Sequence, residues 1–459
     1  MQLGCPKNAI DGEMMIGLLA RAGYAIAHDP AAADVQVVHT CAFLRAAEEE
    51  SIAEILAAAR WKGARRGRRL VVTGCLAERH GAELLAELPE VDALLGPGRI
   101  VEIVGAIDEA LRGEGGVRRG GFGRPEPWGA RLRGGAPHTA YVKIAEGCDH
   151  RCAFCLIPRL RGPQRSRLPA GIVREVRGLA AEGAREVVLV AQDTTAYGRD
   201  LSPRLSLADL LRRLTVGEGP EWLRLLYTHP ARWSEELIDL FARGGRLLPY
   251  VDLPVQHASD AVLQAMGRGR GGARIRRLIE RLRARIPGLV LRTTVITGHP
   301  GEGKREFREL LQFLREFPFD RLGAFAYSPE AGTRAALLPG RAPAKAAEER
   351  RLEVLALQRR LALPLQRARC GRDWPVLLEG WRERDRVWIG RSPAEAPEID
   401  GVVRLRAPGP GEWGADLGEF VTARFLRATA YDTFAVPAEA GAEAGGGRPA
   451  LGGGRRGKP

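Results

Sequence analysis

Three cysteines, Cys148, Cys152 and Cys155, follow one another in the pattern C-x3-C-x2-C. Three thiolates this close in sequence can bind three irons of a 4Fe-4S cubane and leave the fourth iron without a protein ligand. An iron with an open position can chelate the amino and carboxylate groups of S-adenosylmethionine and pass it an electron. The spacing therefore predicts radical chemistry, which the cofactor carries and the protein positions.

Zinc is the competing interpretation of a cysteine cluster. A closed structural zinc site needs four ligands, commonly two C-x2-C pairs or a pair with nearby histidines. The chain has no second C-x2-C pair, and His150 lies between Cys148 and Cys152, where a short loop would hardly turn it onto the same metal. We therefore favour a radical-type iron–sulfur cluster.

The chain has seven cysteines, an odd number, and three of them fall within eight residues. This usage argues against a secreted disulfide framework and favours a reducing compartment. No apolar run approaches the ~18 residues of a membrane helix, and the amino terminus lacks a basic region and an apolar core for export. We expect a cytoplasmic protein without a membrane segment.

A length of 459 residues predicts two to four domains at ~100–200 residues each. The formal charge of +14 could indicate an acidic partner such as RNA. Whether it does depends on where in the chain the positive charges lie. Residues 112–137 carry a net +4 in a Gly- and Pro-rich linker. Residues 268–285 carry eight Arg and one Glu, but apolar residues recur between them at helical spacing. We favour a solvated helix face over an RNA-docking face.

The first 112 residues alternate short apolar runs with helical patterns, as in an α/β domain. Residues 35–38 and 70–72 read as buried parallel strands, and residues 11–22 as a helix capped by Asp11. Cys41 and Cys75 follow these strands, and Cys5 opens the loop before the helix, so three cysteines could converge at one sheet edge. From spacing alone, a second cluster and three buried structural thiols both remain open.

Residues 139–327 contain six strand-then-helix units, which predict an open or closed parallel barrel. The active site of such a barrel lies at the carboxyl ends of its strands, and the cysteine loop follows the first of them. The six expected strands are 140–144, 186–191, 223–227, 250–253, 290–297 and 322–327.

Other polar residues follow strands at the same rim. Gln192 and Asp193 follow the second strand, Gln256 and His257 follow the fourth, and residues 298–302 follow the fifth. Each set has a structural alternative, since Asp193 can cap a turn, Gln256 can satisfy backbone groups and glycines can serve a tight turn. Glycine would also let a flat adenine approach the backbone.

Residues 371–436 read as a small antiparallel β-barrel, with strands at 376–378, 387–389, 402–405 and 421–425. This segment carries nine Arg and no Lys against eleven Asp and Glu, a net charge of −2. A nucleic-acid module is expected to carry a basic patch, which this charge does not suggest. Residues 437–459 are Gly-, Ala- and Arg-rich without periodicity, and we expect a disordered tail.

Over almost its whole length the chain resembles the radical S-adenosylmethionine methylthiotransferases. The resemblance rests on Leu3-Gly4-Cys5-Pro6-Lys7-Asn8, Thr40-Cys41, Thr73-Gly74-Cys75 and Glu146-Gly147-Cys148. The first of these, with residues 192–198 and 396–401, resembles the branch that modifies small-subunit ribosomal protein twelve. The family fold implies an amino-terminal cluster domain at 1–112, a linker at 113–137, a partial (βα)6 radical SAM domain at 138–370 and a TRAM barrel at 371–436.

The resemblance also implies a site and a reaction. Cys148, Cys152 and Cys155 would ligate the radical 4Fe-4S cluster, and Cys5, Cys41 and Cys75 a second 4Fe-4S cluster that holds or supplies sulfur. The reaction replaces a hydrogen on the β-carbon of one aspartate with a methylthio group, at the cost of two S-adenosylmethionine molecules, with no catalytic residue beyond the clusters. The residues implied for binding S-adenosylmethionine are Phe154, Gln192, Gln256, Ile296, Gly298, Gly301 and Glu302.

Some residues depart from the family pattern. Only Met1 and Gln2 precede Leu3, so the first strand of the sheet is expected to be nearly absent or to begin upstream. His39 stands where asparagine is usual, and His299 where an aromatic residue is usual.

The expected partner is ribosomal protein twelve, free or in the subunit, and the enzyme is expected to be a monomer whose electron donor the sequence leaves open. The alternatives are a tRNA-adenosine methylthiotransferase, which the acidic barrel and Asp193 disfavour, and a non-catalytic metal-stabilised RNA-binding protein.

Overall fold

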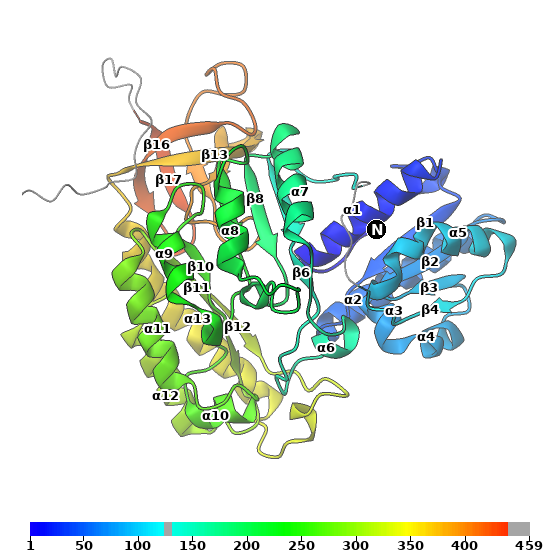
Figure 1. The fold of residues 1–459 in the computed structure, drawn as a ribbon, viewed down its shortest axis with the longest axis horizontal. Coiled ribbons are helices and arrows are strands. Elements are labelled where there is room, and N and C mark those ends of the chain that lie inside the picture. Colours follow the sequence, from blue (N-terminus) through cyan, green and yellow to red (C-terminus); the bar gives the residue numbers. More distant parts are fainter. Residues whose placement is uncertain (124–130, 439–459) are drawn as a thin grey trace, which may run out of the picture.

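The computed structural model describes residues 1–123 and 131–438, which form three regions in chain order (Figure 1). The expected tail from residue 439 onward, and residues 124–130 of the expected linker, lie outside the described residues. Within the described ranges, no helix is both long and apolar enough to cross a membrane.

The amino-terminal region is a parallel four-stranded sheet in the order β1-β2-β3-β4. Its apolar strands are covered by α1 and α5 on one face and by α2, α3 and α4 on the other. The two strands expected here are confirmed, and the segment expected as a linker also contributes β4. The elements are α1 (Pro6–Arg21), β1 (Val35–Thr40), α2 (Arg45–Gly63), β2 (Arg69–Gly74), α3 (Cys75–His80), α4 (Ala82–Glu87), β3 (Ala93–Leu95), α5 (Ile103–Arg112) and β4 (Val117–Arg118), with short 3-10 helices at Pro30–Ala32 and Pro97–Glu102.

Helix α1 starts earlier than its sequence pattern predicted. Asp11 was expected to cap the helix, but the helix begins at Pro6, whose fixed φ suits a first helical position, and Cys5 is the cap residue. Asp11 lies inside the helix and is fully buried. The expectation was wrong because Asp11 has a different task, which is to pair with cations of the barrel.

Residues 1–3 lie along the outer edge of β1. Gln2 forms a single parallel bridge with His39, and the backbone N–H of Leu3 donates to the carbonyl of His39 at 2.9 Å. Residues 1–3 therefore pair with only one end of β1.

The middle region contains the six predicted strands, in two three-stranded parallel sheets with the orders β5-β8-β9 and β10-β11-β12. A bridge between Leu223 and Leu247 and a backbone hydrogen bond from Thr228 to Asp252 (3.2 Å) join them into one curved partial barrel. The strands are β5 (Thr139–Lys143), β8 (Glu186–Val190), β9 (Trp222–Leu225), β10 (Tyr250–Asp252), β11 (Val290–Thr297) and β12 (Arg321–Ala326), with a two-stranded ribbon of β6 (Ala145–Glu146) and β7 (Arg165–Ser166).

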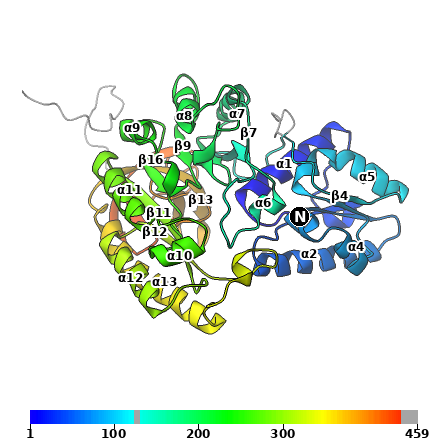
Figure 2. The ribbon, with the colours of Figure 1, turned by 60° about the horizontal axis from the view of Figure 1, so that its bottom comes forward.

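Helices surround the outside of this barrel (Figure 2). They pack the largest apolar cluster of the chain against the outer face of the strands, as a right-handed βα succession requires. They are α7 (Pro169–Ala181), α8 (Leu207–Thr215), α9 (Glu235–Arg243), α10 (Asp260–Ala265), α11 (Gly272–Arg285), α12 (Lys304–Glu316) and α13 (Ala344–Arg367), with 3-10 turns at Thr194–Ala196, Pro230–Arg232 and Ala335–Leu337. The short helix α6 (Ile157–Leu160) instead packs against the amino-terminal region, near α3.

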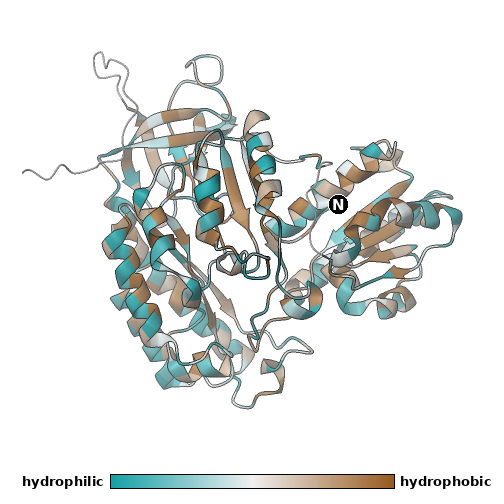
Figure 3. Ribbon diagram, viewed as in Figure 1, coloured by the Kyte–Doolittle hydropathy of each residue, from teal (hydrophilic) through white to brown (hydrophobic). Residues whose placement is uncertain are grey.

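The arginines of α11 form a solvated face, as expected. Arg281 and Arg285 pair with Glu235 of α9, and Arg276 pairs with Glu316 of α12 at 3.4 Å. The outer helices present hydrophilic residues outward (Figure 3). Much of the positive charge in this segment is therefore balanced by neighbouring helices.

The carboxyl-terminal region is a closed five-stranded barrel in the order β13-β14-β15-β17-β16. The sequence pattern predicted four strands and missed β17, a short run that ends in proline. Most pairs are antiparallel as expected, but β15 and β17 run parallel. The strands are β13 (Asp373–Arg382), β14 (Val387–Arg391), β15 (Val403–Leu405), β16 (Phe420–Ala428) and β17 (Thr433–Pro437), with a 3-10 turn at Glu383–Asp385.

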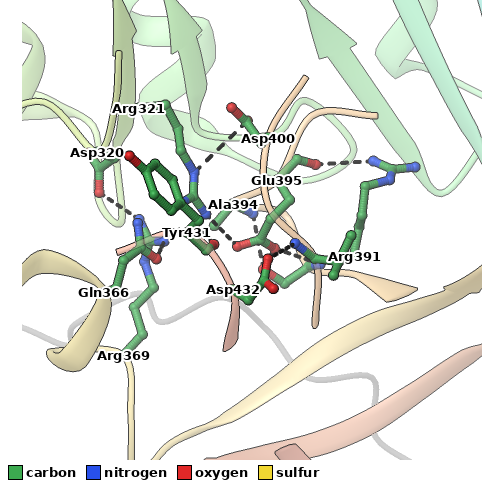
Figure 4. Close-up of polar contacts among 12 residues, drawn as sticks. Asp320, Arg321, Gln366, Arg369, Arg391, Ala394, Glu395, Asp400, Tyr431 and Asp432 are labelled. Carbon is green, nitrogen blue, oxygen red and sulfur yellow. Dashed lines mark hydrogen bonds and ion pairs between the residues drawn. The ribbon is translucent and has the colours of Figure 1, made fainter. Parts of the chain in front are cut away.

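The small barrel packs against the amino ends of the large barrel's strands, opposite the cysteine loop. Figure 4 shows the polar contacts on part of this boundary. Arg391 binds Glu186 at the start of β8 (2.5 Å), and Arg321 at the start of β12 binds Glu395 (2.8 Å). Two of the acidic residues counted in the small barrel, Glu395 and Asp400, thus contact Arg321 and Tyr250 of the large barrel. The net charge of the segment therefore differs from the charge on its solvent-exposed surface.

Candidate functional site

The C-x3-C-x2-C loop starts directly after β6, at the carboxyl end of β5. Gly147 has φ +81°, and a Cβ at this position would lie 2.0 Å from the carbonyl oxygen of Pro163, so only glycine fits. The backbone N–H of Cys148 donates to the carbonyl of Gly162 at 3.1 Å. These contacts fold the loop back on the segment that follows it, at the predicted rim of the barrel.

The other three cysteines come from three separate loops of the amino-terminal sheet. Cys41 follows β1, Cys75 follows β2, and Cys5 precedes α1. Because β1 and β2 are adjacent and parallel, their carboxyl ends reach the same sheet edge. Gly74 has φ +100°, and a Cβ there would lie 2.4 Å from the carbonyl oxygen of Thr40, so the approach of Cys75 to the end of β1 requires glycine.

The six cysteines form two groups, and each is free of disulfides. Within each group the thiols interact electrostatically: Cys5, Cys41 and Cys75 form one group, and Cys148, Cys152 and Cys155 form the other. Among the described residues, no three His, Cys, Asp or Glu side chains are arranged to hold a single metal ion. Each group supplies three thiols, the number of protein ligands of a 4Fe-4S cluster with one open iron, whereas a closed structural zinc site takes four ligands.

The electrostatic surroundings of Cys5 differ from those of Cys75 and Cys155. Burial raises the pKa of Cys75 to about 11 and that of Cys155 to about 12. Cys5 behaves differently: burial acts to raise its pKa, but the cations Lys7 and Arg161 outweigh burial and lower it. A thiolate is therefore easiest to form at Cys5, beside two positive charges.

A buried charge cluster lies between the two cysteine groups. Arg161, which follows α6, donates to Asp11 of α1 at 3.0 Å and to Glu146 at 3.1 Å, and Lys143 at the end of β5 pairs with the same two carboxylates. Arg161 also donates to the side-chain oxygen of Asn8 at 2.5 Å. Burial acts to raise the pKa of Glu146, but Arg161 and Lys143 outweigh burial and hold it well below its ordinary value.

Arg161 connects this cluster to the amino-terminal thiols. It is 2% exposed and hydrogen-bonds to the side chain of Cys75, and its charge acts on Cys5 and Cys41 as well. Glu146, its partner, is two residues before Cys148. One guanidinium therefore contacts the elements that carry both cysteine groups.

A histidine pair lies beside the radical loop. His150 stacks on His229 with ring centroids 4.0 Å apart, and its Nε2 lies 2.7 Å from Asp193, which also pairs with Arg232 at 3.1 Å. Burial would raise the pKa of Asp193, but hydrogen bonds from His150 and Thr195 lower it. Asp193 thus fixes the orientation of His150 inside the cysteine loop, a role that its sequence position alone did not indicate.

The residues predicted to bind S-adenosylmethionine come from four strand ends, those of β5 with its β6 extension, β8, β10 and β11. Gln192 donates to Glu146 at 2.5 Å, and Gln256 has the rare φ of +69° while its backbone bridges to β11. Phe154 and Ile296 pack together around Ala153. Phe154 also makes an edge contact with His299, at 6.1 Å between ring centroids.

The loop after β11 is held from within. Glu302 accepts hydrogen bonds from the backbone of Gly298 (2.8 Å) and from Arg350 (2.6 Å), and it lies 3.1 Å from His257. A Cβ on Gly298 would lie 2.3 Å from the Cβ of Ala347, so this glycine permits packing of α13, whereas a Cβ on Gly301 would meet only Ala265, at 3.6 Å. The structure thus gives Gly298 and Glu302 structural tasks, and their contact with S-adenosylmethionine stays a prediction.

Several residues of this region were missed by sequence reasoning. Lys7 lies in the quoted motif at residues 3–8, and Lys143 and Tyr227 lie in predicted strands, but none of them was given a role. Arg161 belonged to no predicted element, and only the fold brings these four residues together near the cysteines. Lys7 lies with its ammonium 3.4 Å from the centroid of the Tyr227 ring, which bridges α1 and the end of β9.

Comparisons with known proteins agree with this architecture. Three family models match the chain: "Uncharacterized protein family UPF0004" at residues 1–96, "Radical SAM superfamily" at 142–314 and "TRAM domain" at 370–437.

The chain is also similar to curated proteins named ribosomal protein uS12 methylthiotransferase RimO. The relative from Desulforudis audaxviator is 48% identical over 94% of this chain and 95% of its own length. The relative from Desulforamulus reducens is 42% identical, over 94% and 97%. Among solved structures, the radical S-adenosylmethionine methyltransferase TsrM from Kitasatospora setae matches with a TM-score of 0.53 at 18% identity, covering 70% of this chain and 72% of that one, which supports the fold alone.

Proposed function

Because this chain belongs to the family of ribosomal protein uS12 methylthiotransferases, we propose that it replaces a hydrogen on the β-carbon of one aspartate of uS12 with a methylthio group. It is a radical SAM enzyme, and the family implies S-adenosylmethionine and a 4Fe-4S cluster as cofactors. When bound, these cofactors supply one-electron chemistry that abstracts a hydrogen atom.

Hydrogen abstraction suits this substrate on physical grounds. A β C–H bond next to a carboxylate is too weak an acid for any side-chain base whose pKa a protein can tune, so general base catalysis is no route to it. The protein's own residues then have to bind the cofactors, orient the aspartate and keep water away. We therefore assign no side chain of this protein as a catalytic acid or base.

One observation carries the proposal: the chain has two sets of three free cysteines, one set on the amino-terminal sheet and the other on the barrel. We propose that Cys148, Cys152 and Cys155 ligate the radical cluster, and that Cys5, Cys41 and Cys75 ligate a second 4Fe-4S cluster that supplies sulfur. Phe154, Gln192, Gln256, Ile296, Gly298, Gly301 and Glu302 would contribute to the binding of S-adenosylmethionine.

Two cysteine variants test the assignment of the clusters. Anaerobic reconstitution of the native chain should give about eight irons and eight labile sulfides, and Cys148→Ala and Cys5→Ala should each give about four. Cys148→Ala should lose all cleavage of S-adenosylmethionine. Cys5→Ala should still cleave it and should form no methylthiolated product. Cys370→Ala, at the remaining cysteine, is the matched control. Tightly bound zinc without sulfide would contradict the proposal.

Mass spectrometry tests the substrate. Deleting the gene should remove a methylthio mass from one tryptic peptide of uS12 and leave tRNA nucleosides unchanged. Assaying free uS12 beside assembled small subunits would identify the form that is modified. We also propose that the enzyme is a cytoplasmic monomer built from domains at 1–112, 138–370 and 371–436, which size-exclusion chromatography and limited proteolysis would check.

A further inference from the structure

Lys7 is a buried cation at the boundary between the two cysteine groups. It lies in the first turn of α1, two residues after Cys5, and is 8% exposed. Its ammonium lies over the ring of Tyr227 at 3.4 Å from the centroid. Among the described residues, no carboxylate pairs with this ammonium and no oxygen accepts a hydrogen bond from it.

The other buried cations of this boundary have acidic partners. Arg161 and Lys143 share Asp11 and Glu146, and Arg232 pairs with Asp193. A largely buried ammonium without a carboxylate partner loses part of its solvation, and a cation–π contact makes up for only some of that loss. Apart from the thiol of Cys5, whose pKa Lys7 lowers, the described residues give this ammonium no anion, so the contrast points to a carboxylate that comes from outside the chain.

The position of Lys7 is close to the reaction. Tyr227 follows β9 at the rim of the barrel and has φ +61°, a backbone conformation that is uncommon for non-glycine residues. Its carbonyl accepts a hydrogen bond from the backbone of Thr194 at 3.0 Å, and the preceding Asp193 binds His150 of the radical loop. Lys7 therefore stands between the loop of Cys5 and the loop of Cys148.

We propose that Lys7 binds the side-chain carboxylate of the target aspartate, an inference that rests on the function proposed above. The hydrogen is taken from the carbon next to this carboxylate, so one charge-assisted hydrogen bond fixes both the reacting carbon and the identity of the residue. An uncharged asparagine of the same shape would leave the ammonium without its anion. Lys7 thus selects aspartate over asparagine.

Enzyme kinetics with full-length uS12 and its Asp→Asn variant at the target position test this selection. The reconstituted native enzyme, Lys7→Gln, Lys7→Arg and Lys304→Gln are compared, the last being an exposed lysine at the start of α12. Hydrogen bonds to charged groups contribute about 1.5–3 kcal/mol, so Lys7→Gln should lower kcat/KM for uS12 about 10–100-fold, mainly through KM. The value for the Asn variant should change little, Lys7→Arg should restore part of the preference, and Lys304→Gln should match the native enzyme.

The possible outcomes separate the two proposals. A Lys7→Gln enzyme with native iron content and an unchanged Asp-to-Asn preference overturns the inference. Loss of iron and sulfide in Lys7→Gln also overturns it, because Lys7 would then support a cluster. If the native enzyme, with its full iron content, modifies neither form of uS12, the proposed function itself fails.

Discussion

Two buried charge clusters join the barrel to its neighbours, one at each end of the strands. At the carboxyl ends, Arg161 and Lys143 share Asp11 and Glu146. At the amino ends, Arg391 binds Glu186 and Glu379, and Glu186 also binds Arg224 at 2.5 Å. The physics is the same, but only the first cluster contacts cysteines. We infer that the first positions the chemistry and that the second attaches a module.

The largest effect should follow from removing Arg161. Arg161→Met leaves Asp11 and Glu146 with one cation between them, and breaking a buried ion pair costs about 3–5 kcal/mol. The variant should also bind less iron at Cys5, Cys41 and Cys75, because it loses the hydrogen bond to Cys75. Urea unfolding and iron analysis measure the two effects, with Arg159→Gln, an exposed position two residues earlier, as the control. Native iron content in Arg161→Met would contradict the inference that the charge cluster around Arg161, unlike the one around Arg391, positions the chemistry.

Removal of Arg391 should cost less and spare the chemistry. Arg391→Met still leaves Glu186 paired with Arg224, and the side chain of Glu379 is 21% exposed. We therefore expect the free energy of unfolding to fall by about 3 kcal/mol, the lower end of the range for breaking a buried ion pair. Iron content and cleavage of S-adenosylmethionine should stay native below the unfolding temperature. A loss of iron equal to that of Arg161→Met would show that both ends of the barrel control the site.

Acid should weaken the attachment of the small barrel. Burial acts to raise the pKa of Glu379, but His138 and Arg391 outweigh it and lower the pKa to about 2. A carboxyl group with a depressed pKa stabilises the fold above its unfolded value of about 4.3, and this contribution disappears as the pH falls toward 2. The melting temperature should therefore fall between pH 4.5 and about 2. In Glu379→Gln the loss of unfolding free energy over this pH range should be smaller by roughly 1–2 kcal/mol, so its melting temperature should fall less. An identical pH dependence in Glu379→Gln would assign the acid sensitivity elsewhere.

The smallest effect is expected on the exposed face of α11. Arg281→Gln removes an exposed ion pair with Glu235, and such pairs contribute about 0–1 kcal/mol. Stability and methylthiolation should both stay close to native, measured by urea unfolding and product formation. A strong loss of activity on assembled subunits, with free uS12 unaffected, would instead indicate an RNA-docking face.

Sequence reasoning found the features that local patterns encode. The six barrel strands, the parallel sheet and the small barrel follow from apolar runs and turn residues, and the three-cysteine loop is contiguous. It failed where a residue serves a distant partner. Asp11 has the type of a helix cap, but it was needed for Lys143 and Arg161, 132 and 150 residues away.

The charge of the small barrel illustrates the same limit. A count of −2 did not suggest the basic patch of a nucleic-acid module. In the fold, Glu395 and Asp400 face Arg321 and Tyr250 of the large barrel. An outer groove is lined by four arginines and two aspartates, which are Arg382, Arg404, Arg406, Arg427, Asp385 and Asp432. Composition cannot separate the charges that hold a module in place from those that a partner would meet.

Helix α1 has a consequence for how the protein could open. Asp11 is fully buried against the barrel, and Ile10 lies in the apolar cluster that fills the inner face of the strands. A hinge motion that separated the first region from the barrel would leave Asp11 without its two cations, and would leave Lys143 and Arg161 to share the single carboxylate of Glu146. Opening of this boundary is therefore costly, and we expect a target segment to reach the cysteines while α1 stays packed against the barrel.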